Sequence, residues 1–446
     1  MSQLLTTIRD NHRRLWADLR KVDPPASEQD RRWAEAVRRG CIFFYGTQEV
    51  EIGLFGVDWT GAHIAHQEWR AQLNRFFCLP PLAALHEAGE GDDLPGLARQ
   101  LIEDWIDQHP RTDENAPAAG DNLLNMSIRV GQSTGRGWWP SVARFNCSDA
   151  FDDAFLAKMM ASSDAQLDCI RARLNPQGNW RISQLDTLLY CGLVVPGLDS
   201  HLAFAARMLN ECFHRQIQPD GAHEEHCPSY HSWMCDVFTS YWRLGRARPE
   251  LGLKIDAERI IRMWDYLVCS RTGDGDMVPL NDSSRSTKGA APLAPLLARR
   301  AAVLAESGLA PEEWDLERHP SRYFPHAGQV FLRTGWQEDD AVTSFDASRW
   351  DGWHSHLGRN GVSLYAAGRY LLPDPGVFSY EASDPFSAYG RSTRAHNTIN
   401  FGLMNQGEAN PDTHTVSIHQ DLAVVASDYQ GGYYGADFHG NWLTGH

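Results

Sequence analysis

Residues 345–401 read FDASRWDGWHSHLGRNGVSLYAAGRYLLPDPGVFSYEASDPFSAYGRSTRAHNTINF. Two short motifs in this stretch carry three histidines: His354-Ser355-His356, and the run 394–398 around His396. Between them, Asp374 stands in the turn sequence Pro-Asp-Pro-Gly. Imidazole and carboxylate groups are ligands that divalent transition metals take in proteins. The stretch therefore supplies a set of metal ligands and one further imidazole for use as a general base.

The segments between these motifs are short, alternate apolar with polar residues, and are rich in Val, Leu, Tyr and Phe. Glycine and proline separate them, which is typical of β-strands joined by turns. Because side chains i and i+2 of a strand face the same side, the sequence predicts that His354 and His356 point into one site. The alternative is that these histidines are ordinary core or surface residues.

Strand-like patterning extends on both sides of this stretch. Near Arg322 the hydrophobic period changes from about 3.6 residues to 2. The predicted strands are 326–334, 342–345, 362–366, 369–372, 415–419 and 422–427. We therefore expect an antiparallel β domain at 321–446, and we expect this domain to continue beyond the last residue. A small complete sandwich is the alternative.

Residues 1–320 have helical periodicity instead. The clearest predicted helices are 68–85, 94–108, 151–170, 184–195, 201–216, 231–244 and 260–268, the last with Asp256 as its N-cap. We expect about ten to twelve helices in pairs, without notable strands. Such pairing favours a curved array or a toroid of helical hairpins at 1–320 over a single bundle, so the predicted fold class is α+β and multidomain.

Length and composition narrow the class of protein. A chain of 446 residues is too long for one ordinary core, and its net charge of -16 argues against nucleic-acid binding through a general basic surface. No apolar run reaches the length of a membrane span. The nine cysteines form no Cys-x-x-Cys pair, which favours reduced thiols. The N-terminus has no secretory h-region, so we expect a cytoplasmic protein, or a periplasmic one if the native N-terminus is missing.

Three further motifs precede or open the predicted β domain. They are GNWRISQ at 178–184, PDGAHEEHCPSYH at 219–231 and AGQVFLRTGW at 327–336. Together with the motifs around His354, Asp374 and His396, their order resembles the heparinase II/III family of polysaccharide lyases, from about residue 58 onward. Trp180 stands where some members have a histidine, which favours the heparinase III-like branch. Residues 357–360 lack an aspartate that is common near this point, which leaves substrate and metal affinity open.

The resemblance implies a fold, an activity and a set of site residues. It implies an (α/α) toroid at 1–320 packed on an antiparallel β-sandwich at 321–446 that is incomplete in this chain, with the substrate cleft between them. It implies carbon-oxygen lyase activity on a uronic-acid-containing glycan by β-elimination, leaving a 4,5-unsaturated end. It also implies catalytic roles for Asn179, Tyr230 and His354, and a structural zinc ion held by His356, Asp374 and His396. No organic cofactor is expected.

The chemistry of the reaction suits those residue types. Removing the C5 proton beside a uronate carboxylate builds up negative charge, which an amide donor such as Asn179 disperses. A positioned base takes the proton, and an acid protonates the departing C4 oxygen. Tyr230 serves as acid and base in a syn elimination, whereas His354 is the base in an anti elimination or otherwise a partner of the carboxylate. The sequence leaves both routes open.

Other residues are predicted to contact substrate. They are Arg136, Trp180, Glu225, His231, Arg391 and Arg394. Asn281 and Asp282, which follow a loop rich in Gly and Asp, are interpreted as structural. The predicted partner is an acidic polysaccharide or oligosaccharide, with no nucleic acid and no membrane; a homo-oligomer is compatible with the sequence.

Two other functions remain as alternatives. One is a glycoside hydrolase on the same toroid, for which Asp220 and Glu225 are the nearest pair of carboxylates. The other is a non-catalytic protein that binds acidic glycans. Heparan sulfate, alginate, hyaluronate-like polymers and bacterial exopolysaccharides are all open as substrates.

Overall fold

The computed structural model describes residues 2–110, 122–145, 149–285, 293–310, 315–316, 318–352, 354–380, 384–419, 422–436 and 442–445. The chain forms two compact units, one of Met1–Cys212 with Ser240–Lys254 and the other of Phe213–Thr239 with Ile255–His446. The predicted domain boundary at residue 320 lies where helices give way to strands. As a domain boundary it stays a prediction, since the second unit also contains helices that precede it.

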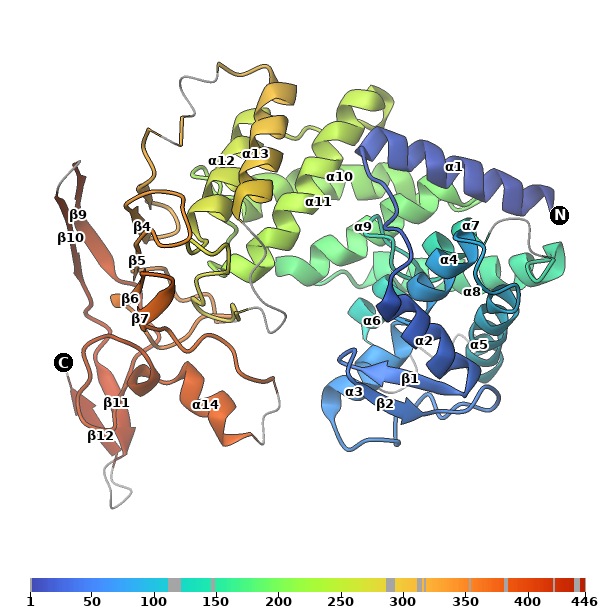
Figure 1. The fold of residues 1–446 in the computed structure, drawn as a ribbon, viewed down its shortest axis with the longest axis horizontal. Helices are drawn as coiled ribbons and strands as arrows, with labels where there is room; N and C mark the ends of the chain where they lie inside the picture. Colours follow the sequence, from blue (N-terminus) through green and yellow to red (C-terminus); the bar gives the residue numbers. More distant parts are fainter. Residues whose placement is uncertain are drawn as a thin grey trace. The chain divides into compact units, whose positions relative to one another are not determined.

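Helices dominate the chain up to residue 307 (Figure 1). Their bounds are α1 Gln3–Leu19, α2 Glu28–Arg38, α3 Gln67–Asn74, α4 Leu79–Glu87, α5 Leu94–Gln108, α6 Leu123–Val130, α7 Trp138–Arg144, α8 Asp153–Ala172, α9 Gly178–Val194, η1 Asp199–His201, α10 Leu202–Gln216, α11 Pro228–Ala247, η2 Pro249–Leu251, α12 Ala257–Cys269 and α13 Leu293–Ser307. Asp256 caps α12 as predicted, because its carboxylate accepts from the backbone N–H groups of Glu258 and Arg259.

Two local predictions for this part are wrong. The helix predicted at 68–85 is two helices, α3 and α4, and Phe76 between them has a φ of 54°. A β-hairpin also lies where no notable strand was expected, with β1 at Cys41–Phe44 and β2 at Gln48–Glu51. Its turn includes Tyr45 and Gly46, both with positive φ, which a helical pattern does not reveal.

Helix α9 is buried along most of its length in the first unit. Every residue from Ile182 to Gly192 is buried, so this part of the helix has no solvent-exposed face, as expected of a helix in the interior of a domain. Asp186 on α9 accepts hydrogen bonds from the Tyr241 hydroxyl at 2.7 Å and from the Ser133 backbone N–H at 2.9 Å. These contacts fix the helix whose first turn carries Asn179.

The second unit holds a five-stranded antiparallel sheet. Its order is β3-β4-β5-β6-β7, with bounds Arg322–Phe324, Gln329–Arg333, Val342–Asp346, Gly361–Ala366 and Arg369–Leu372. Further strands are β8 Asn405–Gln406, β9 Asp412–Ile418, β10 Ala423–Asp428, β11 Tyr433–Ala436 and β12 Trp442–Gly445; two short helices, α14 Pro385–Arg391 and η4 Thr393–Ala395, precede β8. Each predicted strand overlaps one of these, and burial alternates along β5 and β6 as the sequence pattern indicates. The predicted α+β class is confirmed.

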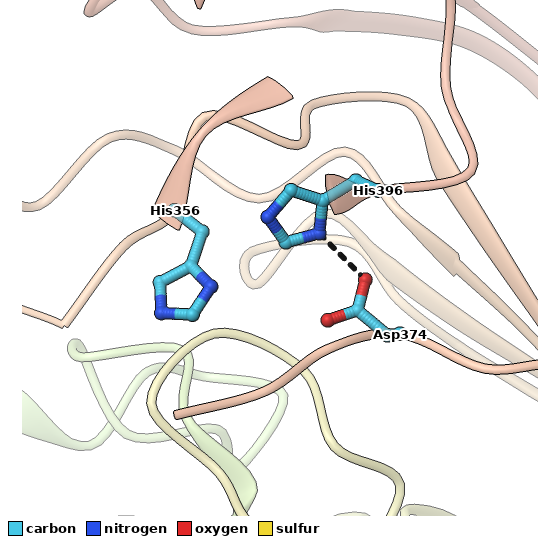
Figure 2. Close-up of side chains that lie close together, drawn as sticks. All are labelled: His356, Asp374 and His396. Atoms are coloured by element: carbon cyan, nitrogen blue, oxygen red, sulfur yellow. Dashed lines mark hydrogen bonds and ion pairs between the residues drawn. The ribbon is translucent and has the colours of Figure 1, made fainter. Parts of the chain in front are cut away.

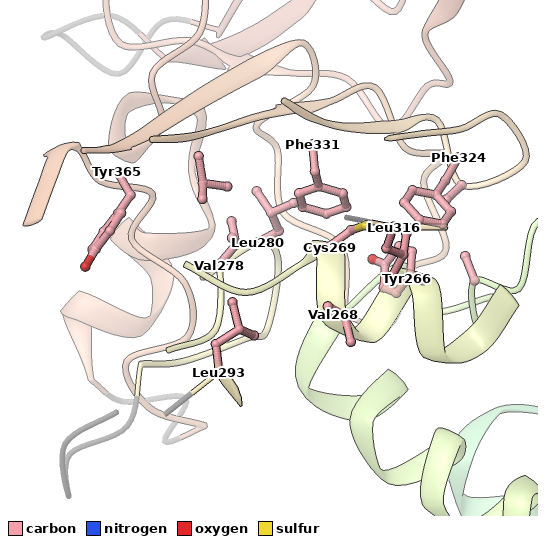
Figure 3. Packing of buried hydrophobic residues seen from close by; sticks show 13 residues of the cluster. Tyr266, Val268, Cys269, Val278, Leu280, Leu293, Leu316, Phe324, Phe331 and Tyr365 are labelled. Atoms are coloured by element: carbon pink, nitrogen blue, oxygen red, sulfur yellow. The ribbon is translucent and has the colours of Figure 1, made fainter. Parts of the chain in front are cut away.

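An aromatic cluster joins α12 to this sheet (Figure 3). The Tyr266 ring on α12 lies 5.0 Å from Phe324 and 5.8 Å from Phe331, measured between centroids. Phe331 is fully buried, and Val342 and Tyr365 extend the cluster along β5 and β6. Burying apolar surface from both α12 and the sheet stabilises the packing of the helix on the sheet.

Membrane-spanning helices and disulfide bonds can be assessed for the described residues only. Among the helices described, none combines the length and apolar character needed to cross a membrane. Eight cysteines are described and all are free thiols; Cys147 lies outside the described residues.

Replacing Phe331 by alanine tests whether the second unit depends on this cluster. The substitution leaves a cavity beneath the sheet, and we expect the free energy of unfolding to fall by about 3–5 kcal/mol. Denaturant unfolding followed by circular dichroism measures the loss. Phe55→Ala is the control, because Phe55 is 79% exposed and its loss should cost less than about 0.5 kcal/mol. Equal effects of the two substitutions would contradict the assignment.

Candidate active site and metal site

The first turn of α11 carries Tyr230 and is tied to the loop 280–283. Pro228 begins the helix, a position where its missing N–H costs nothing. The Ser229 backbone N–H donates to Ser283 Oγ at 3.1 Å, and the Ser229 hydroxyl donates to the Asp282 carbonyl at 3.2 Å. The loop thus satisfies groups at the start of the helix and holds Tyr230 in place.

His354 and His356 lie in the loop between β5 and β6, not on a strand. Asp351 Oδ1 accepts from the backbone N–H groups of His354 and Ser355, both at 3.1 Å. Aspartate favours such local turns over strand pairing, so the predicted strand geometry is wrong at this point. The His356 N–H instead donates to Asn281 Oδ1 at 3.1 Å, which joins this loop to the loop 280–283.

Asp282 is the centre of the site. Its Oδ2 lies 2.7 Å from His354 Nδ1 and its Oδ1 lies 2.8 Å from His356 Nε2. Arg391 Nη2 donates to both oxygens, at 2.7 and 2.6 Å. Burial alone would raise the pKa of this carboxyl, but its hydrogen bonds to the histidines and the charge of Arg391 outweigh burial and lower the pKa to about 2. Asp282 is therefore an anion around which both imidazoles are oriented.

Tyr230 stacks on His354. The ring centroids are 4.0 Å apart and the planes differ by 24°. The Tyr230 hydroxyl lies 2.9 Å from the hydroxyl of Tyr380. Burial raises the pKa of Tyr230 despite that hydrogen bond, so the phenol keeps its proton at neutral pH. The pair places a proton donor beside an imidazole.

The polar cluster beside Tyr230 is mostly interior. His231 is fully buried, and its Nε2 donates to the Met263 carbonyl at 2.8 Å; burial lowers its pKa to about 3. The His231 ring is thus used in packing, and its predicted substrate contact stays a prediction. Glu225 is 5% exposed and lies 3.6 Å from His223 Nδ1 and 3.9 Å from His354 Nε2. Because Glu225 is buried, its position favours an interaction with His354 over a direct contact with substrate.

His356, Asp374 and His396 come together as the motifs predicted. One ligand atom of each lies within 4.8 Å of the others, and Figure 2 shows the two rings and the carboxylate around a common space. His396 Nδ1 is 2.8 Å from Asp374 Oδ2. His356 Nδ1 and His396 Nε2 are buried without a hydrogen-bond partner, and burial lowers the pKa of His356, which favours its neutral form. Imidazole nitrogens without a hydrogen-bond partner, next to a carboxylate, fit a divalent transition metal.

Two glycines allow Asp374 and His396 to come close to His356. Gly376, in the Pro-Asp-Pro-Gly turn, has a φ of 59°, and a Cβ there would lie 2.2 Å from the Ser283 carbonyl oxygen. A Cβ on Gly358 would lie 2.6 Å from Cγ of His396. The turn that carries Asp374 thus packs on the loop 280–283, and the His396 ring lies directly on the Gly358 backbone.

The remaining predicted residues divide between the two units. Asn179 is the second residue of α9, after Gly178 with its φ of 74°, and it is 7% exposed. Trp180 is 40% exposed, and the Arg136 guanidinium lies 5.6 Å from the Phe77 ring. These three belong to the first unit. Their predicted sharing of one pocket with Tyr230 and His354 stays a prediction.

Arg391 and Arg394 lie in the second unit beside His396. Arg391 is bound to Asp282, yet about a third of its side chain is exposed, whereas Arg394 on η4 is exposed. Both remain predicted contacts for acidic groups of a substrate.

Sequence reasoning missed two residues of the site. Asp282 was interpreted as structural, although an Asn-Asp pair after an apolar run was a signal that it could be buried and functional. Tyr380 stood in the aromatic run Val377-Phe378-Ser379-Tyr380 just after the metal motif. That position was the available signal, since aromatic residues in a loop beside ligands often face the same site.

The chain has helices followed by antiparallel sheets. It also has a stacked Tyr-His pair and a group of two histidines and one aspartate that could bind a metal. These features define the class of α+β protein that the motifs predicted. Comparison with known families agrees. The model described as "Heparinase II/III N-terminus" matches residues 1–293, and the model "Heparinase II/III-like, C-terminal" matches residues 317–415. The chain belongs to the heparinase II/III family, so the predicted family is confirmed.

Individual relatives are distant. Heparin-sulfate lyase of Pedobacter heparinus is 24% identical over 367 residues, covering 78% of this chain and 54% of the relative. The chain thus spans about half the length of that curated relative. The crystal structure of heparan sulfate lyase HepC from Pedobacter heparinus matches with a TM-score of 0.65 and 21% identity, over 97% of this chain and 70% of that one. A crystal structure of heparinase III matches with a TM-score of 0.76 and 18% identity, over 97% and 75%. These structures support the fold.

Substituting Gly358 by alanine tests the metal group. The new methyl group would meet the His396 ring, so we expect this group to lose about 10–100-fold in affinity for Zn²⁺, measured by competition with a chelator. Gly96→Ala is the matched control, since a Cβ there meets nothing within 4 Å. Unchanged Zn²⁺ affinity in Gly358→Ala would contradict the assignment of His396 as a ligand.

Proposed function

We propose that the protein is a polysaccharide lyase that cleaves a uronic-acid-containing glycosaminoglycan by β-elimination. The observation that carries the proposal is that the Tyr230 ring stacks on His354, whose Nδ1 lies 2.7 Å from the Asp282 carboxylate. Membership of the heparinase II/III family supports it. The relatives named heparin-sulfate lyase and heparan sulfate lyase favour heparan sulfate as the substrate, ahead of alginate.

Tyr230 is assigned as the acid. Its raised pKa keeps the phenol protonated at neutral pH, and a protonated hydroxyl can donate to the C4 oxygen as that bond breaks. The Tyr380 hydroxyl at 2.9 Å orients the donor.

His354 is assigned as the base. The Asp282 carboxylate accepts a hydrogen bond from His354 Nδ1. This leaves Nε2 as the nitrogen that takes the C5 proton. Glu225, 3.9 Å from Nε2, stabilises the imidazolium that forms. Two buried carboxylates therefore lie next to the His354 imidazole. Their negative charge stabilises the positive charge that the ring gains when it accepts a proton.

Charge on the substrate needs its own partners, because the whole chain is acidic. Asn179 is assigned to the uronate carboxylate; its place in the first turn of α9 puts it where backbone N–H groups lack helical partners and favour an anion. Arg391, Arg394 and Arg136 are assigned to further acidic groups. Trp180, with 40% of its surface exposed, offers a ring on which a sugar can pack.

The metal assigned to His356, Asp374 and His396 is Zn²⁺. When bound, it supplies a fixed positive charge that keeps the three ligands and their loops in one arrangement. Proton transfer is left to Tyr230 and His354, and a lyase of this kind needs no organic cofactor.

The hydrolase alternative loses support. Asp220 Oδ2 accepts from the backbone N–H groups of His326 and Ala327, at 2.7 and 3.0 Å. Glu225 lies buried between two histidines. Neither is placed as a glycosidase carboxylate, which must reach the scissile bond or a water.

Tyr230→Phe tests the proposal because it keeps the stacked ring and removes the proton. Wild-type protein incubated with heparan sulfate should give products with the ultraviolet absorbance of a C4=C5 double bond. Product formation should fall about 10²–10⁴-fold in Tyr230→Phe and persist in Tyr434→Phe, a control at a 41% exposed tyrosine.

Each result that contradicts the proposal would indicate a different alternative. Saturated products would favour the hydrolase, and binding without cleavage over a panel of uronate polymers would favour a non-catalytic protein. Full activity of Tyr230→Phe would refute the assigned acid.

Asp282→Asn tests the orienting carboxylate. The amide keeps the size of the side chain but removes the charge that stabilises a protonated His354, so kcat should fall about 10–100-fold with KM little changed. Steady-state kinetics on the same polymer measure the effect, with thermal unfolding to check folding. Asp339→Asn, at an exposed site in the same unit, is the charge-matched control. A purely structural Asp282 would lower stability without the drop in kcat per folded molecule.

A further inference from the structure

A second set of possible ligands lies in the first unit, among residues that the reaction does not use. Asp164 and Asp168 stand one turn apart on α8, and His201 ends η1, just before α10. Residues four apart on a helix share a face. One ligand atom from each of the three lies within 4.8 Å of the others.

His201 is the informative member of this set. It is 1% exposed, and neither ring nitrogen has a hydrogen-bond partner among the described residues. Its Nε2 lies 3.7 Å from Asp164 Oδ1, too far for a hydrogen bond. Buried polar atoms are nearly always satisfied, so an interior imidazole aimed at a carboxylate without bonding to it calls for a third component between them.

We propose that Asp164, Asp168 and His201 bind a divalent transition-metal ion, and that this ion joins α8 to the start of α10. An imidazole with two carboxylates suits Zn²⁺ and its neighbours better than Mg²⁺ or Ca²⁺, which prefer oxygen alone. Asp164 has 52% of its side chain exposed, which leaves room for water to complete the coordination.

The nearby charges are compatible with a cation. Arg171, one turn beyond Asp168, donates to the Ser200 carbonyl at 3.3 Å and packs over the Phe204 ring at 5.0 Å. Its guanidinium is thereby held by a backbone oxygen and an aromatic face. The two carboxylates still outnumber this single cation. The ion would add a further link between α8 and the segment that begins α10, and its role is structural.

Counting bound metal tests the proposal. The full chain is stripped with a chelator and dialysed against Zn²⁺, and the metal retained per chain is measured. Asp164→Asn/Asp168→Asn, two surface changes that leave the buried imidazole in place, should retain one Zn²⁺ fewer than wild type. Glu211→Gln, which removes one exposed carboxylate on α10, should retain the wild-type number. Equal retention by the double variant and wild type would overturn the proposal and leave a His201–Asp164 ion pair.

Thermal unfolding gives a second readout that does not depend on the group around His356. In a His356→Ala/His396→Ala background, Zn²⁺ should raise the unfolding temperature, since a ligand of the folded state alone stabilises it. Adding Asp164→Asn/Asp168→Asn should abolish that rise. A rise that persists without the two carboxylates would overturn the proposal. Lyase activity enters neither measurement, so its absence would bear on the proposed function alone.

Discussion

The Asp282 carboxylate is the interaction on which the second unit's site depends. A buried anion is costly unless charged and hydrogen-bonding partners surround it. Here His354, His356 and Arg391 meet that need at 2.6 to 2.8 Å. The dependence is mutual, because the two histidines lie in an irregular loop that no strand ladder holds. The loop keeps its shape through Asp351 within it and through the loop 280–283 beneath it.

The loop 280–283 extends this constraint to the other elements. Its backbone and Ser283 hold the start of α11, and the Ser283 carbonyl accepts from Val377, just after the turn that carries Asp374. Asn281 bonds the carbonyl of His226 through its side chain at 2.9 Å. Tyrosine, imidazoles and the predicted metal ligands thus share one support, and a shift of this loop would move all of them together.

Much of this was predictable from the sequence, and the misses have physical causes. Periodicity located the helices and strands, and spacing located His356, Asp374 and His396, because each signal lies within a few residues. Asp282 escaped because its partners are 72 to 109 residues away, and no local pattern reveals such a contact. The burial of His231 was not foreseen, because a histidine in a polar motif is expected to be exposed unless the packing beneath α11 is known. The β1–β2 hairpin was missed because its strands are only four residues each.

The Asp282 carboxylate also leaves a different ring nitrogen open on each of the two neighbouring histidines. Asp282 engages Nδ1 of His354 but Nε2 of His356, so each ring presents its opposite nitrogen. His354 presents Nε2, which suits proton transfer, whereas His356 presents Nδ1 toward His396 and Asp374. A metal-bound imidazole has lost the lone pair that a base needs. The two proposed roles, metal binding by His356 and proton transfer by His354, therefore depend on a shared anion that fixes which nitrogen each ring offers.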